Sequence, residues 1–128
     1  MAGWLPQAKR QLEELARLAA NWDGGGPLEP TEASIRVVEA LLCLIAAGGI
    51  ALRPCLYPAP DGAVRLEWET GHRYVHIEVR SATDINVAWQ MEAAEEPREL
   101  SCLGEAAIYI VLGMVREILR THKEPKKG

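Results

Sequence analysis

The sequence lacks the features that mark several large classes of protein. Its 14 lysines and arginines are outnumbered by 18 aspartates and glutamates, which gives a net charge of −4. Nucleic-acid binding requires a basic surface that neutralises phosphates, so the composition argues against such a partner. No stretch reaches the length of a membrane span, and the N-terminus lacks the pattern of a signal peptide. We therefore expect a cytoplasmic protein with no membrane partner.

Cysteine is scarce and irregularly spaced. Cys43, Cys55 and Cys102 make an odd number, and no two of them have CxxC spacing. This pattern favours reduced thiols in an intracellular protein over a disulfide framework or a zinc finger. Fingerprints of the GxSxG, HExxH, phosphate-loop and dinucleotide-binding types are also absent. The sequence therefore predicts no catalytic residue, no metal and no cofactor.

What is present is the composition of an ordinary folded domain. The chain has 128 residues, of which 48% are apolar and 25% charged, and this length suffices to bury a core without disulfides or metals. We predict a single α+β domain over residues 1–122. A flexible basic tail is expected at 123–128, where like charges cluster at the terminus.

The stretch 52–91 organises the chain, because apolar and polar side chains alternate along it as in half-buried strands. Three runs, at 63–69, 74–80 and 85–91, place their apolar residues on one shared face: Val64, Leu66, Trp68, Val75, Ile77, Val79, Ile85, Val87, Trp89 and Met91. The run before them contains prolines, which remove ladder donors and indicate an edge strand. The prediction is an antiparallel meander of three to four strands.

Two turns set the expected register of these strands. The first is a tight turn centred on Thr70-Gly71, and the second is a loop centred on Ala82. Counting outward gives these apolar pairs: Leu66 with Val75, Val64 with Ile77, Val79 with Ile85, Ile77 with Val87 and Val75 with Trp89. On the opposite face the same register gives these polar pairs: Arg65 with His76, Glu67 with Tyr74 and Arg80 with Asp84.

Three helices complete the expected order α-α-β-β-β-β-α, packed together on the apolar face of the sheet. The predicted bounds are Pro6 to about Ala20, Pro30 or Thr31 to Gly48-Gly49, and a cap at Ser101 running to about Arg120. An acidic connector, Glu92 to Glu99, precedes the third helix. That helix is apolar on more than one side. We expect it either to lie centrally between the sheet and the other helices or to seal a homodimer.

The loop after the first helix contains Asn21-Trp22-Asp23-Gly24 followed by two more glycines. A glycine-rich anion loop normally follows a strand, and this one follows a helix, so a structural turn with Trp22 plugging the core is favoured. Together with Pro60-Asp61-Gly62 and Leu66-Glu67-Trp68, this loop resembles a group of small uncharacterised bacterial proteins with an NWDG loop, a PDG turn and an LEW strand. The resemblance covers about residues 12 to 80. It implies bacterial origin and a shared fold, and assigns no functional residue.

The sequence offers two candidate reactive sites. His76 and Glu78 lie about 6.6 Å apart along one strand, but the expected register puts Arg65 opposite His76, where its charge opposes a cation. Cys102 falls at the expected start of the third helix, where the dipole favours a thiolate. No histidine is placed beside it to serve as a base.

The polar face of the sheet remains as the expected contact surface, because strands hold its side chains rigidly and Tyr, Arg and His favour contacts. The candidate protein-contact residues are Arg65, Glu67, Tyr74, His76, Glu78 and Arg80. We expect a small non-enzymatic bacterial protein that binds another protein or itself, as an accessory, regulatory or antitoxin-like module. The alternative is a small hydrolase or transferase that uses Cys102, or His76 with a carboxylate.

Overall fold

A computed structural model describes residues 3–20, 30–71, 73–92 and 95–123. Within these ranges the chain forms three helices and a five-stranded antiparallel sheet, which confirms the α+β class. The helices are α1 (Leu5–Ala20), α2 (Glu32–Ala47) and α3 (Ala107–Lys123), and a short 3-10 turn spans Pro60–Gly62. The strands are β1 (Cys55–Ala59), β2 (Ala63–Thr70), β3 (Arg73–Ser81), β4 (Asp84–Gln90) and β5 (Arg98–Leu103). The NWDG loop and the basic tail after Lys123 lie outside the described residues.

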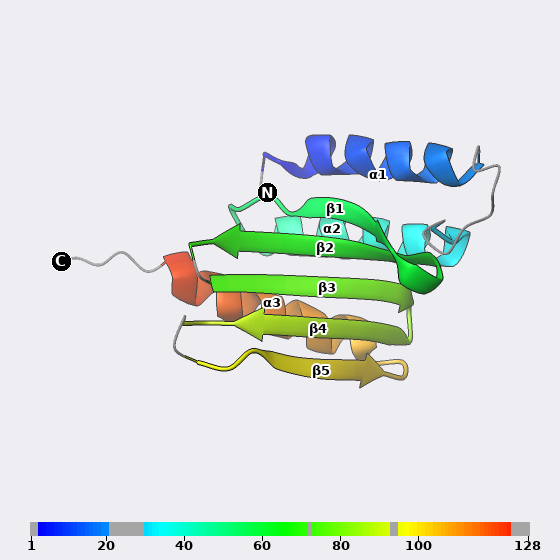
Figure 1. Cartoon of the computed structure of the whole chain (residues 1–128). Helices are drawn as coiled ribbons and strands as arrows, with labels where there is room; N and C mark the ends of the chain where they lie inside the picture. The colour runs from blue at the N-terminus through cyan, green and yellow to red at the C-terminus, as the bar shows by residue number, and fades with distance from the viewer. Residues whose placement is uncertain (1–2, 21–29, 72, 93–94, 124–128) are drawn as a thin grey trace.

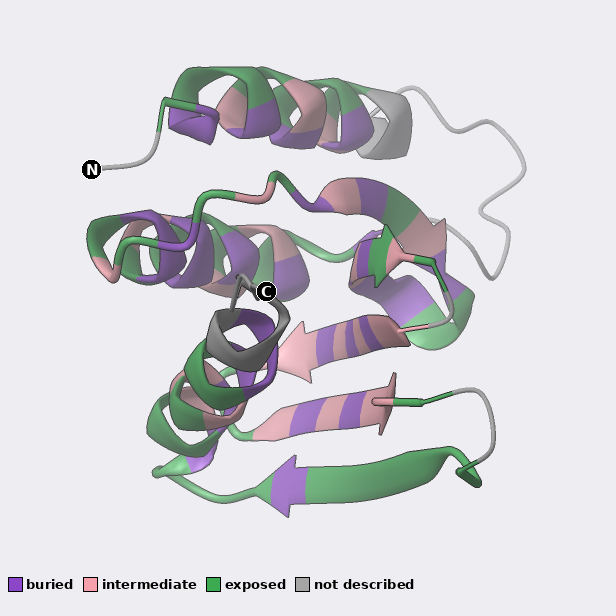
Figure 2. Ribbon diagram, turned by 90° about the vertical axis from the view of Figure 1, so that its left-hand side faces the viewer, coloured by how far each residue is buried: buried purple, intermediate pink, exposed green. Residues whose placement is uncertain are grey.

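The strands follow one another across the sheet in chain order, and α2 and α3 form a second layer behind it (Figure 1). Figure 2 shows the same arrangement from the side: α2 and α3 cover one face of the sheet, and α1 extends this layer beyond β1. The opposite face carries no helix in the described part of the chain. No described helix is both long and apolar enough to cross a membrane.

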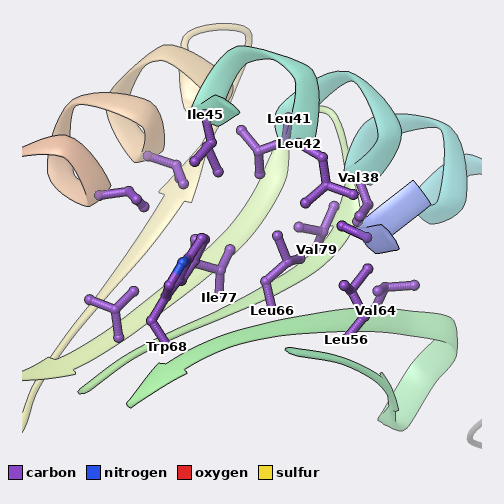
Figure 3. Close-up of a cluster of buried hydrophobic side chains, with 14 of the residues drawn as sticks. Val38, Leu41, Leu42, Ile45, Leu56, Val64, Leu66, Trp68, Ile77 and Val79 are labelled. Atoms are coloured by element: carbon purple, nitrogen blue, oxygen red, sulfur yellow. The ribbon is translucent and has the colours of Figure 1, made fainter. Parts of the chain in front are cut away.

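The core fills the space between the sheet and the helices, as the alternation along the strands predicts. All ten of the expected inward residues pack in or against this core; eight of them are buried, and Trp89 and Met91 are half-buried. Leu41, Leu42 and Ile45 of α2 meet this surface from above (Figure 3). The indole nitrogen of Trp68 donates to the carbonyl of Leu52 at 2.9 Å, so a large apolar side chain is buried without an unpaired donor.

The expected pairing of β2 with β3 was wrong by two residues. Leu66 lies opposite Ile77, and Thr70 pairs with Arg73. This puts Gly71, with a positive φ of 63°, at the first position after β2, where hairpin turns favour glycine. Because the error is an even number of residues, every side chain still points to the predicted face.

The same shift changes the polar pairs across β2 and β3. The observed pairs on that face are Arg65 with Glu78, Glu67 with His76 and Glu69 with Tyr74. The expected pairs across the second turn are confirmed, with Val79 opposite Ile85, Ile77 opposite Val87 and Val75 opposite Trp89. A bulge between Val79 and Ser81 places Ser81, and not Arg80, across from Asp84.

The segment expected to be an acidic connector and a helix start contains a fifth strand. Residues 98–103 pair with β4, and Ser101 lies opposite Asn86 in place of capping a helix. Leu100 and Cys102 take the positions opposite Val87 and Ile85. The strand count of three to four is thereby corrected to five, and α3 begins six residues later than the expected cap, at Ala107.

One of the two expectations for the third helix was wrong: α3 does not lie centrally between the sheet and the other helices. It packs beside α2 on β4 and β5 and buries a single stripe: Ala107, Val111, Val115, Ile118 and Leu119. Its other apolar residues include Tyr109 and Ile110, which are 73% and 44% exposed. The fifth strand widens the sheet, so α3 has a surface of its own to cover.

A buried serine connects the start of α2 to the turn before β2. The hydroxyl of Ser34 donates to the carbonyl of Gly62 at 2.9 Å, and the backbone amide of Thr31 reaches the same oxygen at 2.9 Å. Thr31 in turn caps the helix, since its hydroxyl accepts from the amide of Ser34. These bonds hold α2 over the end of the sheet where β2 begins.

Replacing Leu66 by alanine should lower the free energy of unfolding by about 2 to 5 kcal/mol, because the side chain is fully buried and its removal leaves a cavity. The matched control is Leu44→Ala on α2, where the side chain is 39% exposed; it should cost about 0.5 kcal/mol. Chemical denaturation of the two variants measures both values. Equal losses would contradict the one-sided core.

Candidate functional site

The uncovered side of the sheet gathers the polar residues of all five strands, and we call it the polar face. Two rows run straight across it, as the pairing of neighbouring strands shows. The residues of the first row are Tyr57, Arg65, Glu78, Asn86 and Ser101. The residues of the second row are Cys55, Glu67, His76, Ala88 and Glu99. Each position is set by the backbone ladder and not by a flexible loop.

Ion pairs connect the charged groups at the centre of this face. The guanidinium of Arg65 contacts Glu78 at 2.5 Å and Glu67 at 3.3 Å, and Arg80 contacts the other oxygen of Glu78 at 3.5 Å. The hydrogen bond from Arg65 to Glu78 raises the pKa of Arg65, which therefore stays charged. Because Arg65 is 36% exposed, each pair contributes at most about 1 kcal/mol to stability. Their effect is to hold the charges in place.

His76 lies beside this network and turns toward two other carboxylates. Its Nε2 atom is 3.0 Å from Glu69 Oε2 and 3.9 Å from Glu67 Oε1. The ring of Tyr74 stands against the imidazole, with centroids 4.6 Å apart and planes inclined by 34°. Three groups from β2 and β3 thus fix the position of the histidine.

A shallow open depression of about 440 Å³ lies over β2 to β5. Its lining is polar and consists of Arg65, His76, Glu78, Arg80, Asn86, Ala88, Glu99 and Ser101. The floor is ordered by hydrogen bonds: Asn86 donates to Glu99 at 2.7 Å and accepts from Ser101 at 3.1 Å. Such a hollow fits a side chain of a partner better than a buried small molecule, which requires a deeper and more apolar cavity.

Comparison of the chain with protein-family models, curated proteins and solved structures finds no match.

The structure places all six predicted contact residues on one face but rearranges their neighbours. Arg65 lies opposite Glu78 and not opposite His76, and its guanidinium is shared between Glu78 and Glu67. His76 does not contact Glu78; its partners are Glu67 and Glu69.

Sequence reasoning missed Glu69 as a partner of His76, and it also missed Tyr57 and Cys55 on the polar face. Both belong to β1, opposite Arg65 and Glu67. The neighbouring Cys55 and, more weakly, the carboxylates of Glu67 and Glu69 raise the pKa of Tyr57. The alternation of Cys55 and Tyr57 with Leu56 was the available signal, but the prolines obscured it.

Cys102 was expected at a helix start, and this was wrong. It lies in β5, it is 3% exposed, and burial raises the pKa of its thiol. It also projects from the apolar side of the sheet, opposite Ile85, whereas His76 projects from the polar side. The two side chains are thus separated by the sheet and cannot form a nucleophile–base pair.

A variant with Cys43→Ser and Cys55→Ser keeps Cys102 as its single thiol. In the native state at neutral pH, Cys102 should react with iodoacetamide at least about tenfold more slowly than a small free thiol, because it is buried and protonated. Mass spectrometry over time measures the rate. The same variant in denaturant should react like a free thiol, and faster labelling of the native protein would restore the nucleophile hypothesis.

Proposed function

We propose that this protein is a non-enzymatic binding module of a bacterial cytoplasm, with an accessory, regulatory or antitoxin-like role, and that its polar face recognises a partner protein. The observation that carries the proposal is the one-sided architecture. Helices α2 and α3 cover one side of the sheet and α1 lies beyond its β1 edge (Figure 2). The other side presents charged and aromatic groups.

The composition of the polar face supports protein contact. Tyrosine and arginine are among the residues that contribute most to protein interfaces; Arg65 lies on β2 in the middle of this face, and Tyr74 lies on the same face at the start of the central strand β3. Their neighbours hold them in place, so little side-chain entropy is lost on binding. Mixed charges give such a surface selectivity, since a partner must match Arg65 and Arg80 as well as the carboxylates between them.

The double variant Arg65→Ala/Tyr74→Ala should lose its partner while remaining folded. Affinity capture from the source cell, quantified by mass spectrometry, identifies proteins retained by the native chain; binding of the purified candidate should then weaken by at least about tenfold in the variant. Thermal unfolding should change little, because the ion pairs of Arg65 are partly exposed.

A matched control removes the same residue types from the helical side of the protein. Arg36 of α2 has a side chain that is 76% exposed, and Tyr109 of α3 is 73% exposed. The double variant Arg36→Ala/Tyr109→Ala should keep the partner. A partner that both variants bind equally well, or that only this control loses, would contradict the proposal.

The edge of β5 that does not pair with β4 suits a second copy of the chain as partner. The edge of β1 contains Pro58 and is approached by α1, whose Gln11 donates to the carbonyl of Leu56 at 3.4 Å. Among the described residues β5 pairs only with β4, and Leu100 and Leu103 are 43% and 67% exposed. Open strand edges pair readily with another strand.

The homodimer was expected through the 101–120 helix; we propose instead that it forms by antiparallel pairing of two β5 strands about Leu100. This register sets Leu100 against its own copy and Glu99 against Ser101 of the second chain, so that both chains keep their apolar faces on the same side. Helix α3, which carries the exposed Tyr109 and Ile110, packs on β4 and β5.

The substitution Leu100→Lys should convert a dimer into a monomer, because two lysines would face each other at the pairing axis. Light scattering at high protein concentration measures the mass. The control Leu44→Lys, at a position of similar exposure on α2, should leave the dimer intact. A native chain that stays strictly monomeric at high concentration would rule out this interface.

A further inference from the structure

The observed register creates a group of side chains that the expected register kept apart. Glu67 and Glu69 project from β2 toward His76 of β3, and one atom from each residue lies within 4.8 Å of the other two. We infer that Glu67, Glu69 and His76 bind a divalent first-row transition-metal ion of the Zn²⁺ type. The inference is independent of the partner proposed above.

The separations of the three atoms fit a shared ion. Zinc binds imidazole nitrogen and carboxylate oxygen at about 2.0 to 2.2 Å, which puts two such ligands about 3.0 to 3.5 Å apart. The distance from His76 Nε2 to Glu69 Oε2 is 3.0 Å, and the distance to Glu67 Oε1 is 3.9 Å. The Glu67 carboxylate must move toward His76 by less than about 1 Å to reach this spacing.

The surroundings position the ligands as metal sites require. Tyr74 stands against the imidazole of His76 and limits its rotation. Arg65 binds the second oxygen of Glu67, Oε2, and thereby leaves Oε1 toward His76. Such contacts behind the ligands orient them and raise metal affinity. The guanidinium itself is shared with Glu78, which offsets its repulsion of a cation.

The chemistry of the ligands decides the class of ion. One imidazole with two carboxylates suits zinc and its first-row neighbours, whereas Mg²⁺ and Ca²⁺ prefer oxygen ligands alone. The side chain of Glu69 is 61% exposed, so the group is open to solvent on one side. Three protein ligands with an open position characterise sites at which a water or a partner's side chain completes the coordination.

Isothermal titration of the chelator-treated full chain with Zn²⁺ tests the inference. The native protein should bind one ion at this site, and His76→Gln and Glu69→Gln should each weaken that binding by at least about tenfold. The control Glu39→Gln removes an equal charge from the exposed side of α2 and should bind as the native chain does. In the native protein, Zn²⁺ should also shift the NMR signals of the His76 ring before those of other residues.

Three results would overturn the metal site. Absence of stoichiometric Zn²⁺ binding would leave an ordinary imidazole–carboxylate hydrogen bond as the whole explanation of the 3.0 Å contact. Undiminished binding by His76→Gln would assign the zinc to the cysteine thiols or another site. Equal competition by Mg²⁺ would show only a diffuse attraction to acidic groups.

Discussion

The pairing of β2 with β3, and with it the burial of one side of the sheet, is the constraint on which the rest of the molecule depends. Leu66 and Ile77 face each other with no exposed surface. Strand side chains alternate with a period of two, so burying these residues sends their neighbours to the other face. Burial of one set of alternating side chains therefore creates both the surface that the helices cover and the surface that they leave exposed.

The core and the polar face respond differently to a shift of the strands. A slip of two residues exchanges one apolar neighbour for another, and the burial energy changes little. The same slip changes every polar contact, because the polar side chains differ in charge and in donor and acceptor groups. In the observed register His76 faces Glu67, whereas in the expected register it faces Arg65. A shift of two residues in the pairing of β2 with β3 thus separates a candidate metal site from a site that repels cations.

The fifth strand shows how a local signal is overridden by the sheet. Ser101 before an apolar run is a good helix cap, yet residues 98–103 extend the sheet and bury Cys102 against Ile85. Pairing with β4 satisfies the backbone groups on one side of the segment and gives α3 a surface to cover. The thiol that local sequence makes reactive becomes part of the core, and the edge of β5 becomes the exposed border of the sheet.

Periodicity along the chain determined the α+β class, the two faces of the meander, and the group of residues that share the polar face, because alternation is a local property that tertiary packing preserves. Only the tertiary structure decided which of those residues touch. The contact of His76 with Glu69 and the burial of Cys102 depend on where turns begin and which strand pairs with which. Long-range strand pairing sets both. Apolar alternation cannot distinguish registers that differ by an even number of residues, because each places the same side chains on the same face.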